Sequence, residues 1–184
     1  MRYLFAKAET LKPQRQENMA SGISSKIVEI RNENIKKCMG DFNTISHRQQ
    51  YIDTIDGVMF YDDSKAESVN ATWFTFENIV NPVVWIVGGS FHSNYSELID
   101  TARKKVKTII SIGSEQENIE MTFRGAVREI YGANSIEEAV RMASIIAEEN
   151  DLVLFSPACK DHGMDYDDRG NQFVEEVKKL NQTC

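Results

Sequence analysis

The segment Asp62–Lys65 places two carboxylates, a hydroxyl group and an ammonium group side by side in the chain. It directly follows the apolar run Val58–Tyr61, which is typical of a buried strand. It precedes Asn70–Ile79, which is predicted to be a helix with an apolar face formed by Trp73, Phe74, Phe76 and Ile79. Polar groups between the carboxyl end of a strand and the start of a helix lie where open α/β sheets bind ligands. The alternative is that Asp62, Asp63 and Ser64 only cap the turn into the helix.

Two further predicted strands end in small or polar residues. The apolar run Val83–Val87 is followed by Gly88–Ser90, and Asp151–Phe155 is followed by Ser156–Cys159. Because the carboxyl ends of parallel strands share one edge of a sheet, we expect these segments to meet near Asp62–Lys65. That convergence favours a binding site over a simple turn.

Strands and helices are predicted to alternate along the rest of the chain. Gln50–Tyr61 surrounds the turn pair Asp56-Gly57 and predicts a β-hairpin. Further strands are expected at 108–112 and 126–130, and further helices at 18–39, 95–107, 115–124, 135–149 and 170–180. The pattern predicts a Rossmann-like α/β fold: a mainly parallel sheet with helices on both faces, preceded by a helix and a β-hairpin. We expect residues 1–17 to be a poorly ordered lead, 18–40 a separate helix, and 41–184 the main domain.

Composition limits the classes of partner. The chain has 184 residues, of which 41% are apolar and 27% charged, as in globular proteins. Its formal net charge of −7 argues against nucleic acid as a partner. No apolar run approaches the roughly 20 residues needed to span a bilayer, and Met1–Glu17 lacks the features of a signal peptide. We therefore expect a cytoplasmic protein with no membrane partner.

The cysteines and histidines do not predict a metal site. Cys38, Cys159 and Cys184 are widely spaced and odd in number, which fits reduced thiols. The three histidines show no close ligand spacing with them. We interpret Cys159 as a small buried thiol rather than a reactive one.

Five separated motifs together resemble one known family. Their order and spacing resemble those of the C-terminal domain of the Mur ligases, especially the D-glutamate-adding ones. The motifs are His47-Arg48, the corner Asp62–Ala66, Gly88-Gly89, Ser156–Cys159 and Arg169-Gly170. The resemblance extends over about residues 18–180. Asn18–Met39 is similar to the last helix of the family's central domain, and Phe42 also fits.

The resemblance implies a reaction in which ATP, with Mg²⁺, activates a carboxylate for attack by an amine. The substrates would be a UDP-MurNAc-peptide and an amino acid. His47, Arg48 and Asp63 would be cofactor-binding, Arg48 through charge and Asp63 through the ribose. Ser64 and Lys65 would hold the carboxylate of the amino acid. Arg169 would brace the Ser156 loop rather than touch a ligand.

The predicted substrate-binding residues differ from the family pattern at three positions. Glu67 stands in place of a threonine, His92 in place of a lysine, and Asp161, with His162 beside it, in place of a serine. Two added carboxylates would repel D-glutamate. A further hypothesis is therefore a ligase domain whose amino-acid site accepts a cationic amino acid instead of D-glutamate.

No Gly-x-x-x-x-Gly-Lys-Ser/Thr loop occurs in the sequence. The family places that loop and its magnesium ligands in the central domain, so we expect no catalytic residue and no complete ATP or Mg²⁺ site in this chain. The possible partners include the missing N-terminal and central domains. The alternative to a ligase domain is a non-catalytic remnant or interaction module with the same fold. Each of the two predicted ligand-binding cations also has a simpler interpretation. Arg48 could be an ordinary surface residue, and Lys65 could be paired with Asp62 or Glu67.

Overall fold

A six-stranded sheet forms the centre of the part of the chain that the structure describes. The structure is a computed structural model, and it describes residues 46–90, 92–161 and 163–181. The strand order is β1-β2-β6-β3-β4-β5, and every pair except β1–β2 is parallel. The strands are β1 (Gln50–Ile55), β2 (Val58–Asp62), β3 (Val83–Val87), β4 (Val106–Ile112), β5 (Glu129–Ala133) and β6 (Leu152–Phe155).

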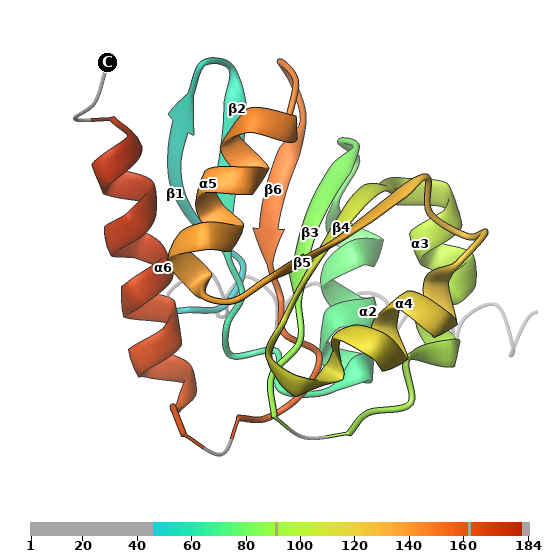
Figure 1. The fold of residues 1–184 in the computed structure, drawn as a ribbon. Coiled ribbons are helices and arrows are strands. Elements are labelled where there is room, and N and C mark those ends of the chain that lie inside the picture. Colours follow the sequence, from blue (N-terminus) through green and yellow to red (C-terminus); the bar gives the residue numbers. More distant parts are fainter. Residues whose placement is uncertain (1–45, 91, 162, 182–184) are drawn as a thin grey trace, which may run out of the picture. The chain divides into compact units, whose positions relative to one another are not determined.

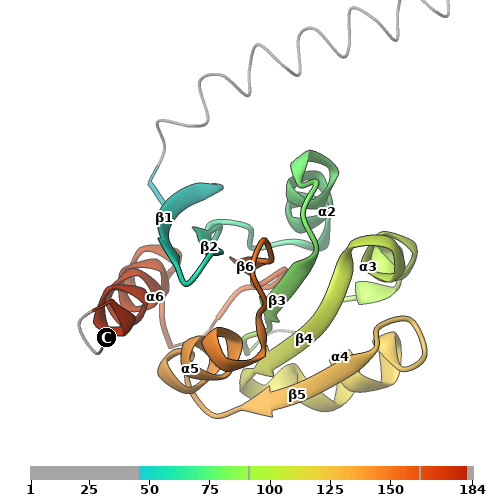
Figure 2. The ribbon, with the colours of Figure 1, turned by 90° about the horizontal axis from the view of Figure 1, so that it is seen from above.

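Helices cover both faces of this sheet (Figures 1 and 2). The helices are α2 (Val69–Asn78), α3 (Ile99–Lys105), α4 (Gln116–Phe123), α5 (Ile136–Ile146) and α6 (Tyr166–Leu180), with short 3₁₀ turns η1 (Tyr95–Leu98) and η2 (Gly113–Glu115). Figure 2 shows α2, α3 and α4 on one side of the sheet and α5 and α6 on the other. The predicted Rossmann-like, mainly parallel fold is confirmed.

The central strand β3 explains how the two layers of helices are held. All five of its residues are fully buried, because both faces of the sheet are covered. Trp85 packs edge-on against Phe76 of α2 and Phe123 of α4, while Ile86 points into the core under α5 and α6. Apolar burial on both faces stabilises the sheet. The sheet in turn positions the loops that follow the carboxyl ends of its strands.

The predicted hairpin is confirmed in position and type. Strands β1 and β2 pair antiparallel and place Ile55 opposite Val58. Asp56 and Gly57 between them have φ values of 50° and 79°, the left-handed conformation that a two-residue type I′ turn requires.

Several predicted boundaries and one predicted face are wrong. The strand expected at 126–130 begins three residues later, because Ala126 and Val127 still close the last turn of α4 through the Phe123 carbonyl. Helix α6 begins at Tyr166 rather than at residue 170, because Asp165 caps it. On the predicted apolar face of α2, Phe76 is buried as expected but Trp73 is exposed, and Thr72 and Thr75 are buried beside Phe76.

Some predictions concern residues outside those that the structure describes. They are the predictions for residues 1–17 and 18–40, Cys38, Phe42, His162 and Cys184. Among the helices that the structure does describe, none has the length and hydropathy of a membrane span.

Candidate functional site

Three strand ends converge as the sequence predicted. Backbone hydrogen bonds join the loops after β2, β6 and β3, which are neighbours in the sheet. Asp63 donates its N–H to the Phe155 carbonyl (2.8 Å), Ser156 to Ile86 (3.1 Å), and Gly88 to Pro157 (3.1 Å). These bonds continue the ladder past the strand ends and fix the three loops relative to one another.

The Asp63 carboxylate lies at the centre of a buried polar network. It is 1% exposed. Its Oδ2 accepts hydrogen bonds from Thr75 Oγ1 (2.7 Å) and Ser156 Oγ (2.9 Å), and its Oδ1 accepts one from the Gln49 amide (3.2 Å). Burial raises the pKa of Asp63 to about 6, although these bonds and the Arg48 charge act in the opposite direction. Asp63 thus joins α2, the β6 loop and the turn before β1.

Asp62 anchors that same turn from the other side. Its Oδ2 lies 2.6 Å from Nδ1 of the buried His47, and its Oδ1 accepts the Ser64 amide (2.9 Å). His47 and Gln49 both have positive φ values, 63° and 46°. The half-buried Arg48 is therefore held between two residues that adjacent carboxylates fix in an uncommon conformation.

Asp62, Asp63 and Ser64 do not cap α2. The N-cap is Ser68, whose hydroxyl accepts a hydrogen bond from the Ala71 amide (3.3 Å). The interpretation that Asp62–Ser64 only cap the turn into the helix is therefore wrong. Asp62 and Asp63 also bind the His47–Gln49 turn, Thr75 and Ser156, and the Ser64 hydroxyl donates to Tyr166.

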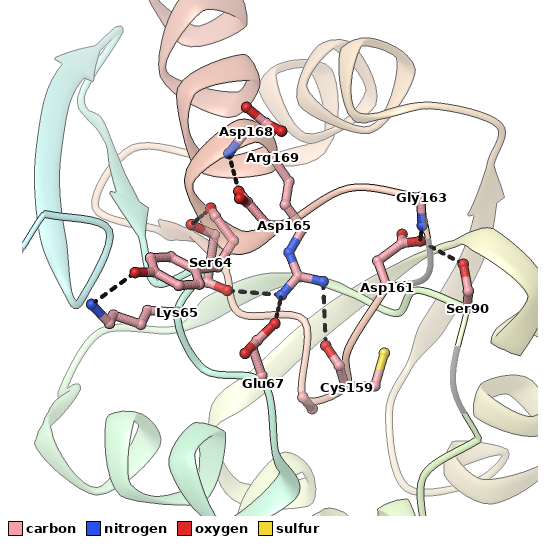
Figure 3. Close-up of polar contacts among 12 residues, drawn as sticks. Ser64, Lys65, Glu67, Ser90, Cys159, Asp161, Gly163, Asp165, Asp168 and Arg169 are labelled. Carbon is pink, nitrogen blue, oxygen red and sulfur yellow. Dashed lines mark hydrogen bonds and ion pairs between the residues drawn. The ribbon is translucent and has the colours of Figure 1, made fainter.

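Arg169 ties the Ser156 loop to the Asp62–Glu67 corner (Figure 3). The residue is 2% exposed. Its Nη1 donates to the Cys159 carbonyl (3.3 Å), and its Nη2 donates to the Ser64 carbonyl (3.1 Å) and to Glu67 Oε1 (3.2 Å). The predicted bracing role of Arg169 is confirmed, and Glu67 is its ion-pair partner.

Ser64 and Lys65 both contact Tyr166, the first residue of α6. The buried Ser64 hydroxyl donates to the Tyr166 carbonyl (3.0 Å). The Lys65 ammonium lies 3.4 Å from the Tyr166 hydroxyl and 4.5 Å from its ring centroid, a cation–π geometry. The Lys65 ammonium thus contacts an aromatic residue and not Asp62 or Glu67, so the simpler interpretation of Lys65 is wrong.

The predicted site residues His92 and Asp161 lie in a more open rim, which we define as Ser90, His92 and Asp161. Asp161 Oδ1 accepts hydrogen bonds from Ser90 Oγ (2.6 Å) and from the Gly163 amide (3.1 Å). The His92 side chain is 77% exposed and lies 3.3 Å from Glu115 Oε2. His92 therefore lies apart from the corner. Its neighbour Glu115 was not predicted.

Sequence reasoning missed Thr72, Thr75 and Tyr166. Thr72 and Thr75 lie three positions apart on the inner face of α2, where Thr72 Oγ1 reaches Ser156 Oγ at 2.8 Å. Hydroxyl groups at helical spacing beside Asp63 were the available signal. Tyr166 had none, because its contact with Lys65 joins residues 101 positions apart. Cys159 is a buried free thiol, as predicted, and burial raises its pKa.

The five sequence motifs lie around the carboxyl edge of the sheet, as expected for one class of α/β domain. The family model described as "Mur ligase, glutamate ligase domain" matches residues 47–159, so the chain belongs to the Mur ligase C-terminal domain family. Among its relatives is the UDP-N-acetylmuramoylalanine–D-glutamate ligase of Christiangramia forsetii, 37% identical over 165 residues, or 88% of this chain and 37% of the relative. The same ligase of Porphyromonas gingivalis is 37% identical over 169 residues, 90% of this chain and 38% of the relative.

Solved structures share the fold at lower identity. The MurF ligase of Thermotoga maritima in complex with ADP matches 75% of this chain and 33% of its own, with 15% identity and a TM-score of 0.50. Escherichia coli FolC in complex with ADP matches 76% of this chain and 33% of its own, with 16% identity and a TM-score of 0.53. The chain thus spans little more than a third of the relatives it matches.

Proposed function

We propose that this chain acts as the C-terminal domain of an ATP-dependent ligase that adds D-glutamate to a UDP-MurNAc-peptide in peptidoglycan synthesis. The observation that carries the proposal is the 37% identity to D-glutamate ligases over 88–90% of the chain. We place the reaction in the cytoplasm and in cell-wall biogenesis during cell division. Because the sequence contains no ATP phosphate loop, the complete reaction requires the N-terminal and central domains as partners.

For the nucleotide, Arg48 is the group that fits. ATP supplies the phosphoryl group that activates the carboxylate, and the Arg48 guanidinium offers positive charge to it. The Asp63 carboxylate is already satisfied by Thr75, Ser156 and Gln49. Because Asp63 is 1% exposed, a direct contact between its carboxylate and a ribose would require the surrounding groups to move. We therefore assign Asp63, together with His47, the task of holding the turn that carries Arg48.

The described residues include no group of three His, Cys, Asp or Glu side chains arranged to hold a metal ion. We accordingly assign the Mg²⁺ ligands to the partner domains.

For the amino acid, Lys65 is the cation that would pair with its carboxylate. The buried Ser64 would contribute by keeping the corner in place against Tyr166. Glu67 repels an anionic substrate less than the sequence suggests, because Arg169 balances its charge at 3.2 Å. The contacts of His92, Asp161 and His162 with a substrate stay predictions.

Reconstitution tests the proposal. The whole chain is combined with the N-terminal and central domains of the Christiangramia forsetii relative, and ADP release is measured with UDP-MurNAc-L-alanine and D-glutamate. We expect D-glutamate-dependent ADP release. The relative's own C-terminal domain, supplied in the same two-piece format, is the positive control. If that control is active and this chain gives no release, the ligase proposal fails and the non-catalytic module is favoured.

A further inference from the structure

One buried acid beside the rim is not used by the proposed reaction. Glu115 is the last residue of η2, directly before α4, and it is 8% exposed. Its Oε2 accepts hydrogen bonds from Asn118 Nδ2 (2.8 Å) and from the Ser93 amide (3.4 Å). A buried carboxylate is costly unless hydrogen bonds and a charged partner satisfy it. Among the described residues, His92 is the side chain that forms an ion pair with Glu115.

The His92 ring is held at Nδ1 and open at Nε2. Both of its polar contacts with described residues are made through Nδ1, which lies 3.3 Å from Glu115 Oε2 and 3.4 Å from Asn118 Nδ2. The side chain as a whole is 77% exposed. Because the two nitrogens lie on different edges of the imidazole, a ring held at Nδ1 presents Nε2 to solvent.

The contacts of Asn118 indicate where the ring carries its proton. The amide nitrogen of Asn118 has two hydrogens. Glu115 Oε2 accepts at 2.8 Å and the Ser93 carbonyl at 3.1 Å, and both distances are shorter than the 3.4 Å to His92 Nδ1. Asn118 therefore has no hydrogen left for Nδ1, and the remaining partner of Nδ1 is the Glu115 carboxylate. An acceptor at this place favours a proton on Nδ1.

We propose that Glu115 is a positioning residue for His92. It keeps a proton on Nδ1 and turns Nε2 toward the ligand. When the ring is protonated, its Nε2–H donates to the carboxylate of the amino acid, and Glu115 stabilises the positive charge of the imidazolium. The identity of this ligand rests on the proposed ligase function, whereas the pairing of Glu115 with His92 does not.

The pairing is tested by NMR of the whole chain with nitrogen-labelled histidine, at about pH 9, where histidine is neutral. The His92 signals are the ones lost in His92→Gln. We expect Nδ1 of His92 to carry the proton. Glu115→Met removes the acceptor and should move the proton to Nε2, whereas Glu115→Gln keeps an acceptor oxygen and should retain Nδ1–H. A wild-type ring with its proton on Nε2, or a proton that stays on Nδ1 in Glu115→Met, overturns the proposal.

The effect on the substrate is tested in the two-piece ligase assay. Glu115→Gln removes the negative charge behind His92 and should raise KM for D-glutamate about five- to tenfold, with kcat within about twofold. In a His92→Gln background the same change should have no further effect on KM, because Glu115 acts through His92. A purely structural role of Glu115 would instead raise KM in both backgrounds, and that result overturns the proposal.

Glu117→Gln is the matched control. Glu117 is exposed in the first turn of α4, so this change removes one carboxylate from the same region and leaves the contacts of His92 in place. It should leave both the nitrogen signals of His92 and KM unchanged; a rise in KM equal to that of Glu115→Gln overturns the proposal. An inactive assembly counts against the ligase proposal alone, because the NMR experiment still decides whether Glu115 positions His92.

Discussion

The corner Asp62–Glu67 and the rim formed by Ser90, His92 and Asp161 lie at the same edge of the sheet, but the fold constrains them differently. In the corner, buried carboxylates and backbone groups are held by Arg169, Thr75 and Ser156. In the rim, His92 is largely exposed, and the Asp161 carboxylate, which accepts hydrogen bonds from the Ser90 hydroxyl and the Gly163 amide, is only partly buried. The matching residues His47, Ser156 and Arg169 bond to this corner, so they also stabilise the domain. Similarity there reports the scaffold, whereas two of the departures from the family pattern, His92 and Asp161, lie at the rim.

The largest effect is expected from Gly170→Ala, which disrupts the corner directly. A Cβ at this position would lie 2.2 Å from His47 Nδ1 and 2.4 Å from Ser64 Oγ. Both groups are buried and hydrogen-bonded, so the loss should exceed the usual overpacking cost and reach about 4 kcal/mol in the free energy of unfolding. Urea denaturation measures it. Gly163→Ala is the control beside the rim, because its Cβ would have nothing nearer than 4.0 Å; equal losses for the two variants would contradict the comparison.

Arg169→Met should cost about 3 kcal/mol, because it leaves the Cys159 and Ser64 carbonyls and Glu67 without their donor. The same denaturation experiment measures it. At the rim, His92→Gln should change stability by less than about 0.5 kcal/mol, since its side chain is 77% exposed. A small loss for Arg169→Met would show that the corner does not depend on this residue.

Asp63→Asn sharpens the comparison through pH. The pKa of Asp63 is about 6 in the folded chain against an ordinary value of 3.8, so folding favours its protonated form. The stability it contributes is fully present below pH 3.8 and is lost as pH rises through 6. The shift corresponds to about 3 kcal/mol as an upper estimate. The wild-type free energy of unfolding, minus that of Asp63→Asn, should therefore fall between pH 4 and pH 7; a difference that stays flat or rises would refute the assignment.

The smallest effect is expected where the corner meets solvent. Tyr166→Leu removes the ring under the Lys65 ammonium, and we expect a loss of about 0.5–1 kcal/mol for this partly exposed pair. Tyr166→Phe keeps the ring and should lose less. If Tyr166→Phe matched Tyr166→Leu in thermal denaturation, the hydroxyl group and not the ring would be the important contact.

The sequence predicted the parts of the fold that depend on local pattern. The apolar run of β3 predicts a buried strand, and the Asp56-Gly57 pair predicts a chain reversal. Both signals come from residues that are adjacent in the sequence. The inner face of α2 was predicted only at Phe76, because Thr75 is buried against a polar partner, Asp63, which apolar periodicity does not detect. Strand β5 was misplaced because it is an edge strand with exposed residues such as Tyr131, which gives a weak apolar signal.

The location of the candidate site was predicted from the sequence, but the contacts among its residues were predicted only in part. The convergence of three strand ends follows from parallel topology, so it could be foreseen. The pairing of Glu67 with Arg169 joins residues 102 positions apart and depends on how α6 packs. Sequence reasoning therefore counted Glu67 as a free negative charge, and the ion pair corrects that view.

The most direct test of the account is the two-piece ligase assay with paired variants from the corner and the rim. If the corner provides the carboxylate contact and the rim adjusts it, Lys65→Met should reduce kcat/KM for D-glutamate by about 100-fold, the equivalent of one lost charge-assisted contact. Asp161→Ser, which removes a negative charge, should raise kcat/KM. Activity that is indifferent to Lys65, or that falls in Asp161→Ser, would contradict the division between corner and rim.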